Sequence, residues 1–320
     1  MKTITKILLF ALAILTVSCE DIVEEDITND SVQIISPMNG VVITSNVVNF
    51  QWNELEGADK YRVQVYNDDQ AIVLDSLVNH YNFTYPMLPG SYQWRVRGEN
   101  FAYQTEYTFP VNFTLMASED LATQQVVLSS PSNNYYTNST SLICTWSPIT
   151  TADYYELELL NITNGSSTVV DQQSNITTNS VNLTSANLAQ EGQYQWKIKA
   201  VNDSPSQTLF STRNFYIDRT NPNQPQNTLP PNNSIQTINQ SISLSWTLPT
   251  DTGTIQSSLN YVIEFSNDVN FTTIIQSSSS STNSSSQTFT TPGIYYWRVK
   301  AIDVAGNIGV YSSAFKFTIN

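Results

Sequence analysis

A short aromatic motif occurs three times in this chain, at residues 90–96, 192–198 and 293–299. Each copy begins with a glycine and then places a tyrosine, a tryptophan and an aliphatic residue at alternate positions. Because consecutive side chains of a β-strand point to opposite faces, these three apolar side chains share one face of a strand. The motif therefore predicts three equivalent strands, each with one face turned to a core.

The rest of each repeat is visible once the three motifs are aligned. Each copy is preceded by an upstream tryptophan and then by an alternating strand that begins at a tyrosine: Trp52 and Tyr61, Trp146 and Tyr155, Trp246 and Tyr261. The unit recurs about every 100 residues and has room for about seven short strands, which is typical of a β-sandwich. The sequence predicts an all-β chain of three tandem β-sandwiches, at residues 31–116, 126–218 and 226–320.

These units resemble fibronectin type III domains and closely related immunoglobulin-like domains of bacterial surface proteins. The resemblance rests on the upstream tryptophans, on the Leu-Pro-Gly-x-Tyr corner at residues 88–92, and on residues 304–307 of the last repeat. The second repeat departs from it at residues 188–192, where the Pro-Gly pair is missing. The resemblance implies fibronectin-type-III-like sandwiches for residues 31–320. It implies little about function, because this fold hosts many unrelated roles.

The first 18 residues are typical of an export signal. Lys2 and Lys6 precede an apolar stretch, residues 7–17, that is too short to cross a bilayer comfortably. The stretch leads into Ser18 and Cys19 and resembles a bacterial lipobox, which implies cleavage before Cys19 and attachment of acyl chains such as palmitate. An ordinary secretory signal with a chance cysteine is the alternative. No other stretch is long and apolar enough to cross, so we expect lipid on Cys19 to be the membrane anchor.

The segment that follows, residues 19–30, is strongly acidic and shows no strand alternation. Like-charged runs of this kind stay solvated, so we expect a flexible tether. Acidic residues after a lipidated cysteine also resemble the surface-export signals of Bacteroidetes lipoproteins, which implies an outer-membrane protein exposed at the cell surface. The whole chain carries 27 acidic against 13 basic residues, a formal net charge of −14, which argues against nucleic acid as a partner.

Cysteine and histidine give little support to catalysis. Cys144 alone remains once Cys19 is lipidated, so no disulfide within the chain is predicted. Cys144 lies on the inward side of its strand, which favours a buried core residue over a nucleophile. His80 is the only histidine, and we expect it at the surface. We therefore predict that the chain is not an enzyme and uses no cofactor.

Two pairs of side chains carry the oxygen atoms that calcium prefers as ligands. These are Asp303 with Asn307, and Asp251 near Asp268. Isolated pairs of this kind are weak indicators, and loop carboxylates exposed to solvent are the preferred interpretation. We therefore predict no metal site.

Basic residues concentrate on the outward faces of the three motif strands: Arg95, Arg97, Lys197, Lys199, Arg298 and Lys300. In this fold the motif strand pairs with the strand that begins at the tyrosine. Glutamates of the second and third repeats should then lie beside these cations: Glu156, Glu158 and Glu264. We expect cross-strand ion pairs that each contribute about a few tenths of a kcal/mol.

The first repeat departs from this pattern. Its partner strand offers Arg62 and Gln64 opposite Arg95 and Arg97, so three like charges share one face unless loop acids approach. Repulsion without a counter-charge suggests a missing anion. We therefore hypothesise that Arg62, Arg95 and Arg97 bind an anionic ligand, such as a carboxylate-bearing glycan or an acidic protein surface. A neutralised cluster is the alternative.

Together these features predict a non-catalytic cell-envelope lipoprotein that mediates binding or adhesion to a glycan or a surface protein. Loop tyrosines such as Tyr103, Tyr135 and Tyr136 are candidates for stacking on sugar rings, or else for ordinary packing at strand ends. A structural spacer or accessory subunit of an outer-membrane complex is the alternative. A hydrolase is the third possibility, and it would need two carboxylates that flank a cleft.

Overall fold

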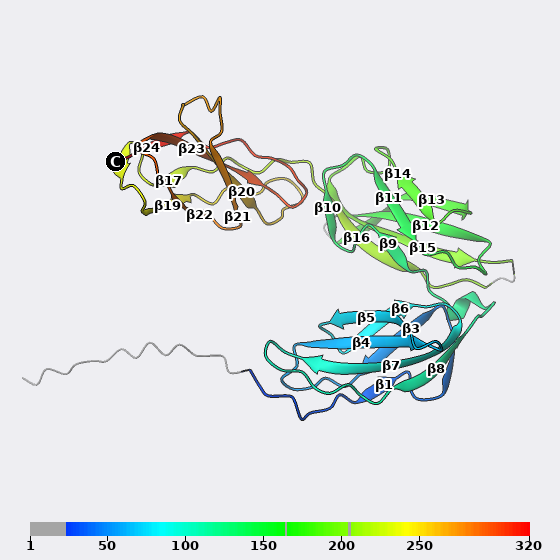
Figure 1. The fold of residues 1–320 in the computed structure, drawn as a ribbon. Helices are drawn as coiled ribbons and strands as arrows, with labels where there is room; N and C mark the ends of the chain where they lie inside the picture. The colour runs from blue at the N-terminus through cyan, green and yellow to red at the C-terminus, as the bar shows by residue number, and fades with distance from the viewer. Residues whose placement is uncertain (1–23, 164, 204–205) are drawn as a thin grey trace, which may run out of the picture. The chain divides into compact units, whose positions relative to one another are not determined.

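The computed structural model describes residues 24–163, 165–203 and 206–320 (Figure 1). The predicted signal peptide and Cys19 lie outside the described residues. Within the described ranges the chain is all-β, apart from one short 3-10 helix at Leu121–Thr123. No helix in that part of the chain is long and apolar enough to cross a membrane.

The chain folds into two compact units. The first comprises the described residues up to Ile43 together with Val47–Met116 and holds the first sandwich. The second comprises Thr44–Asn46 and Ala117–Asn320 and holds the second and third sandwiches. The predicted fold class, tandem fibronectin-type-III-like β-sandwiches, is confirmed by three pairs of sheets, each of three strands and five strands.

The two sheets of the first sandwich show the pattern. The three-stranded sheet has the order β1-β3-β6 and contains Ile34–Ser36, Val47–Trp52 and Asn82–Pro86. The five-stranded sheet has the order β2-β8-β7-β4-β5 and contains Val41–Thr44, Val111–Met116, Gly90–Glu99, Lys60–Asn67 and Ile72–Val78. The first aromatic motif lies on β7, at the centre of the larger sheet.

The second and third sandwiches repeat this plan. In the second, β14-β11-β9 contains Ser180–Leu183, Leu142–Trp146 and Leu128–Ser130, and β10-β16-β15-β12-β13 contains Tyr135–Thr137, Ser211–Ile217, Gly192–Val201, Tyr154–Thr163 and Ser166–Ile176. In the third, β17-β19-β22 contains Asn227–Leu229, Ser241–Trp246 and Ser284–Thr288, and β18-β24-β23-β20-β21 contains Ser234–Gln236, Phe315–Ile319, Gly293–Ile302, Asn260–Ser266 and Gln276–Ser280.

The tryptophans lie in the cores, as the alternation predicts. All six are fully buried or nearly so: Trp52, Trp94, Trp146, Trp196, Trp246 and Trp297. In the first two sandwiches the upstream tryptophan and the motif tryptophan pack with their ring centroids 6.3 Å apart. Burial of a large aromatic side chain contributes roughly 2–3 kcal/mol, so these pairs are a main source of stability for each sandwich.

The motif tyrosine fixes the turn that leads into its strand. Its hydroxyl donates a hydrogen bond to the carbonyl oxygen four residues earlier, in the pairs Tyr92–Leu88, Tyr194–Gln190 and Tyr295–Thr291. The three bonds are 2.8, 2.9 and 2.9 Å long. The second sandwich therefore keeps this corner even though its turn lacks the Pro-Gly pair.

Candidate functional site

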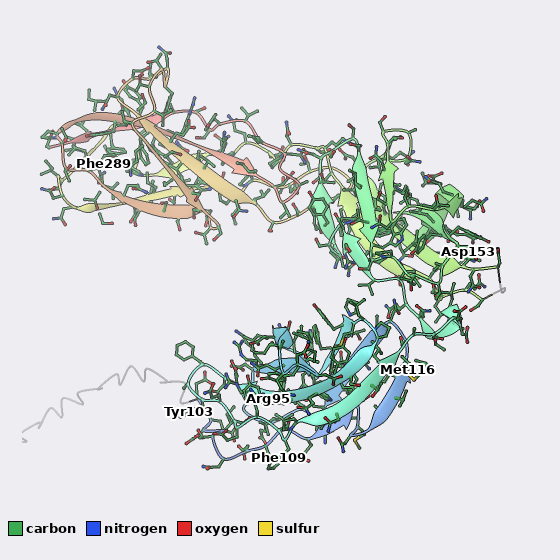
Figure 2. The ribbon with its side chains drawn as sticks, turned by 45° about the vertical axis from the view of Figure 1, so that its right-hand side comes forward. Arg95, Tyr103, Phe109, Met116, Asp153 and Phe289 are labelled. Carbon is green, nitrogen blue, oxygen red and sulfur yellow. The ribbon has the colours of Figure 1, made fainter. Side chains whose placement is uncertain are left out.

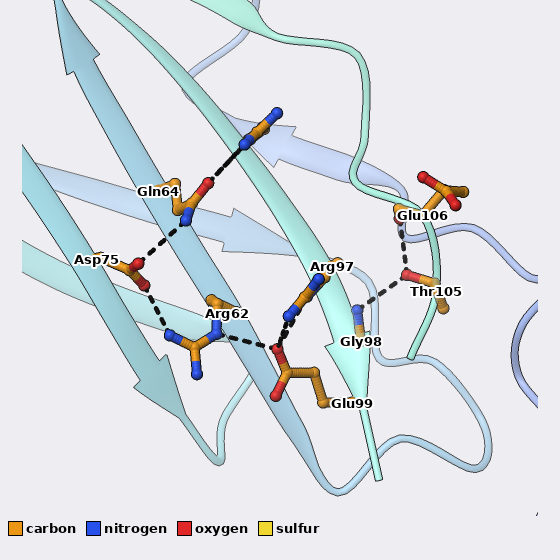
Figure 3. A network of polar contacts seen from close by, with 9 residues as sticks. Arg62, Gln64, Asp75, Arg97, Gly98, Glu99, Thr105 and Glu106 are labelled. Carbon is orange, nitrogen blue, oxygen red and sulfur yellow. Dashed lines mark hydrogen bonds and ion pairs between the residues drawn. The ribbon is translucent and has the colours of Figure 1, made fainter. Parts of the chain in front are cut away.

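The outward face of β4 and β7 in the first sandwich carries the arginines that the sequence singled out. Strand register places Arg62 opposite Arg97 and Gln64 opposite Arg95. On the other side of β4, Gln64 lies opposite Asp75 of β5. Figure 3 shows how this third strand brings a carboxylate to the face. We refer to these residues, with Glu99, as the arginine face.

The expectation that this face lacks counter-charges is wrong. Arg62 forms ion pairs of 3.0 Å with both Asp75 and Glu99, and Arg97 forms one of 2.7 Å with Glu99 (Figure 3). Asp75 was missed because it comes from β5, which lies beyond the strand pair that the register argument considered. Glu99 was also overlooked, although it follows Arg97 by two residues and so shares its side of β7, and strand alternation was the signal that could have found it.

Arg95 is held in a different way. Its guanidinium donates hydrogen bonds of 3.0 and 2.8 Å to the Gln64 side-chain oxygen. It also lies over two aromatic rings, 4.1 Å from the centre of Tyr107 and 5.2 Å from that of Tyr66. Within the described ranges, no carboxylate lies within ion-pair distance of it. Ligand binding by Arg62, Arg95 and Arg97 therefore stays a prediction, and it has lost the charge imbalance that motivated it.

The two carboxylates of the arginine face have pKa values below their ordinary ones and therefore stay ionised at neutral pH. Burial raises the pKa of Glu99, but the hydrogen bonds and charges of Arg97 and Arg62 outweigh it, so the pKa lies below its ordinary value. The pKa of Asp75 is likewise lowered: burial raises it, and hydrogen bonds from Gln64 and Arg62 more than compensate. Both carboxylates therefore stabilise the fold at neutral pH.

The cross-strand ion pairs predicted for the other two sandwiches are confirmed, except at Lys300. Lys199 pairs with Glu156 and Lys197 with Glu158, both at 2.9 Å. In the third sandwich Arg298 pairs with Glu264 at 2.7 Å. Lys300 instead lies over the ring of Tyr311, 4.6 Å from its centre.

The catalytic candidates have the surroundings expected of structural residues. Cys144 lies fully buried in the core of the second sandwich, and burial raises the pKa of its thiol to about 12. A reactive thiolate is therefore not available. His80 is exposed. A hollow of about 430 Å³ in the second sandwich is lined by Glu156 and Glu158, but lysines engage both carboxylates.

The loop tyrosines differ in their surroundings, and stacking on sugar rings stays a prediction. Tyr136 packs against Tyr216 with ring centroids 4.4 Å apart, which is ordinary packing between neighbouring strands. Tyr103 and Tyr135 are exposed. Two phenylalanines that the sequence analysis did not single out are more exposed than these tyrosines. Phe101 is 92% exposed and Phe109 is 94% exposed, both between β7 and β8.

A second polar cluster lies where the second sandwich leads into the third. One carboxylate oxygen from each of Asp218, Asp251 and Asp303 lies within 4.8 Å of the others. Asp218 is fully buried and Asp303 is 4% exposed, so the expectation of solvated loop acids is wrong for this group. We refer to these three residues as the carboxylate cluster.

Sequence reasoning found part of this cluster. It paired Asp303 with Asn307, and the Asn307 amide does donate a 2.8 Å hydrogen bond to Asp303. It paired Asp251 with Asp268, whereas Asp268 instead accepts hydrogen bonds from Ser266 and Thr272 in its own turn. Asp218 was not singled out, because nothing local in the sequence indicates that it lies buried beside loops of the next sandwich.

The electrostatics of the cluster are unfavourable without a counter-charge. Burial, and then the charges of Asp303, Asp251 and Glu191, raise the pKa of Asp218 to about 6, although a hydrogen bond from the Thr220 N–H lowers it. Two like charges about 4–5 Å apart repel by roughly 3–4 kcal/mol at an effective dielectric constant of about 20. Among the described residues, no lysine or arginine forms an ion pair with any of the three.

Two solved structures similar to this chain contain fibronectin type III domains. The FN1–FN3 domains of chicken CNTN1 are 17% identical, with 91% of this chain and 98% of that one covered and a TM-score of 0.46. The fibronectin(III)-like modules of Clostridium thermocellum CbhA are 14% identical, with 58% and 94% covered and a TM-score of 0.22. No protein-family model and no curated protein matches the chain. Its own sheet topology and tyrosine corners define it as a tandem array of fibronectin-type-III-like sandwiches.

Proposed function

We propose that this chain is a non-catalytic lipoprotein of the cell envelope that binds a glycan or protein ligand through its first sandwich. Lipid on Cys19 would anchor it in the outer membrane, and the acidic segment after Cys19 would hold the sandwiches at the cell surface. The lipobox resemblance supports the anchor. The binding role is supported by the surface of the first sandwich.

The observation that carries the binding role is the exposure of Phe101 and Phe109. Both belong to the segment that connects β7 to β8, and Figure 2 shows Tyr103 and Phe109 at the surface of this sandwich. A phenylalanine ring that stays in water forgoes roughly 2 kcal/mol of hydrophobic stabilisation, and here that occurs twice in one segment. Exposed aromatic side chains are also the groups that contribute most where proteins bind ligands.

The equivalent segments of the other sandwiches differ. In the second sandwich the most exposed large side chain between β15 and β16, within the described residues, is Leu209, at 86%. Its neighbour Phe210 lies 5.2 Å from the Lys199 ammonium and is only partly exposed. In the third sandwich the corresponding segment exposes Val310 and the ring of Tyr311 covers Arg298. The two nearly free aromatic rings are thus a feature of the first sandwich.

A spacer role is the second candidate, and it is favoured by the linker between the second and third sandwiches, residues 218–226, which connects β16 to β17. A Cβ atom on Gly253 would lie 2.8 Å from the Thr220 hydroxyl oxygen, and one on Gly309 would lie 2.7 Å from the Pro222 carbonyl oxygen. Linker and loops are therefore in close contact, with no space for a side chain at either glycine. A linker that packs closely against neighbouring loops suits a structural spacer, whose role is to hold other parts of an assembly a set distance apart.

Capture of ligands from intact cells tests the binding role. The mature chain should retain a ligand, and the double variant Phe101→Ala/Phe109→Ala should retain roughly tenfold less or none. Leu209→Ala is the matched control, because it removes an equally exposed side chain from the equivalent segment of the second sandwich. A glycan array run in parallel separates the two ligand classes. Equal capture by all three chains, or co-purification with a membrane complex that the double variant does not change, would favour the spacer role.

A further inference from the structure

The carboxylate cluster draws on three separate parts of the chain. Asp218 directly follows β16, the last strand of the second sandwich. Asp251 lies in the loop between β19 and β20, and Asp303 directly follows β23. The fold of the second compact unit therefore gathers one carboxylate from the linker and two from loops of the third sandwich.

One oxygen in this cluster lacks a partner. Oδ1 of Asp218 accepts a hydrogen bond of 3.1 Å from the Thr220 N–H, whereas Oδ2 is buried with no hydrogen-bond donor. Both oxygens of Asp303 accept bonds from Asn307, and both oxygens of Asp251 accept bonds from Thr252 and Ser257. A fully buried carboxylate oxygen with no donor is rare in folded proteins and calls for an explanation.

Among the described residues, no lysine or arginine pairs with the unpaired oxygen. Arg219 is the nearest cation in the sequence, and its Nη2 donates instead to the carbonyl oxygens of Ser139 and Leu188. The Asn307 amide donates to Asp303 and to the Asp218 carbonyl oxygen, at 2.8 and 3.0 Å. These bonds orient the cluster and leave its charge unbalanced.

We propose that Asp218, Asp251 and Asp303 bind one calcium ion. Calcium takes six to eight oxygen ligands, and three carboxylates supply up to about six oxygens, with water to complete the shell. The donor set contains no histidine or cysteine, which zinc, copper and nickel sites prefer. Magnesium fits less well, because it requires near-octahedral geometry and keeps most of its water.

An access path also exists. Asp251 is half-buried and lines an open hollow of about 720 Å³. Tyr136 lines it from the second sandwich, and Leu248, Gln256 and Tyr261 line it from the third. A hydrated ion could approach Asp251 through this hollow before it reaches the two buried carboxylates. The ion would then tie the linker at Asp218 to both loops of the third sandwich.

The chain contains its own matched controls for this site. The same local turn, in which an aspartate accepts a bond from the N–H two residues later, occurs at Asp26 and Asp120. Both aspartates are exposed, and the hydroxyl of Ser206 donates a 2.7 Å bond to Asp120. The turn is therefore shared, and within the described part of the chain it lies buried beside two further carboxylates only at Asp218.

Calorimetric titration of the chelator-treated full chain with calcium chloride tests the proposal. We expect one ion per chain with a dissociation constant of about 0.1–1 mM, as in extracellular calcium modules. Asp218→Asn and Asp303→Asn should each weaken binding by about tenfold or more, and Asp120→Asn should bind as the parent chain does. Magnesium chloride should bind at least about tenfold more weakly than calcium.

Asp251→Asn is the variant that keeps the test valid if substitution of the buried Asp218 or Asp303 disrupts folding. Its side chain is half-buried, so the substitution should leave tryptophan fluorescence unchanged while it weakens calcium binding. Absence of any calcium binding to the parent chain would overturn the proposal. So would binding that Asp218→Asn, Asp303→Asn and Asp251→Asn all leave unchanged, because the ion would then lie elsewhere.

Discussion

The arginine face of the first sandwich and the carboxylate cluster beside the third sandwich differ in whether their charges have partners of opposite sign. On the arginine face, two carboxylates lie within 3.0 Å of Arg62 and one of them also pairs with Arg97. The third cation, Arg95, lies over aromatic rings. In the carboxylate cluster three anions lie within 4.8 Å of one another, and no cation pairs with them among the described residues.

The difference follows from how each group is assembled. Neighbouring strands place side chains about 4.5–5.5 Å apart across the sheet, so a cation on one strand meets a partner on the next. Loops and linkers carry no such register, and here they bring together three acids, two of which are buried. A charge that the chain does not balance calls for a bound ion, whereas a balanced face needs none.

The largest effect should come from removal of the shared carboxylate on the arginine face. Glu99→Gln leaves Arg62 and Arg97 next to each other with one carboxylate fewer, and both arginines are partly buried. We expect the free energy of unfolding of the first unit to fall by about 2 kcal/mol, measured by urea denaturation. Glu158→Gln, which breaks a single lysine pair, should cost about 0.5 kcal/mol. Equal costs would show that Glu99 does not act as a shared partner.

Removal of a carboxylate from the carboxylate cluster should raise the free energy of unfolding instead of lowering it. In a chelator at neutral pH, Asp218→Asn removes a buried charge and its repulsion from Asp251 and Asp303. We expect the second unit to become more stable by about 1–2 kcal/mol. Asp75→Asn, which weakens an ion pair on the arginine face, should lower stability by about 1 kcal/mol. Thermal unfolding of both variants in the chelator measures the two signs, and a destabilised Asp218→Asn chain would contradict the description of the cluster as unbalanced.

Lysine substitutions compare Arg298, which has an ion pair as well as ring contacts, with Arg95, which has ring contacts but no ion pair among the described residues. Arg298 donates two hydrogen bonds to one oxygen of Glu264, whereas Arg95 donates to an uncharged glutamine. Arg298→Lys should therefore cost about 1 kcal/mol and Arg95→Lys about half of that, in urea unfolding. A larger cost at Arg95 would show that contact with Tyr66 and Tyr107 stabilises this region more than ion pairing does.

A fall in pH should reduce the contribution of the arginine face to the free energy of unfolding, by a smaller amount than the substitutions do. The folded-state pKa of Glu99 lies below its ordinary value of 4.5, so the unfolded chain binds more protons than the folded one as the pH falls through this range. The stabilisation is therefore complete above about pH 5 and declines as the pH falls below 4.5. Between pH 6 and about pH 3, the urea midpoint of unfolding should fall less steeply for Glu99→Gln than for the parent chain. Identical slopes would contradict this role for Glu99.

Features that depend on strand alternation and register could be predicted from the sequence. The inward tryptophans, Cys144 in the core and the pairs of Lys197 and Lys199 with glutamates all follow from which residues share a face. Asp75 was missed because it lies on β5, a third strand that joins this face. The length of the loop between β4 and β5 does not determine which residues of the two strands pair. Asp218 was missed because the cluster needs three loops that are 33 to 85 residues apart in the chain, and no local pattern specifies their approach.

The most direct test of the unbalanced cluster is a crystal structure of the full chain grown with calcium, with anomalous diffraction to locate the ion. We expect one strong peak about 2.3–2.6 Å from oxygens of Asp218, Asp251 and Asp303, and none beside Asp26, Asp120 or the arginine face. A structure grown in millimolar calcium with no anomalous peak at the cluster would contradict this expectation, as would a lysine or arginine side chain paired to Asp218 in place of the ion.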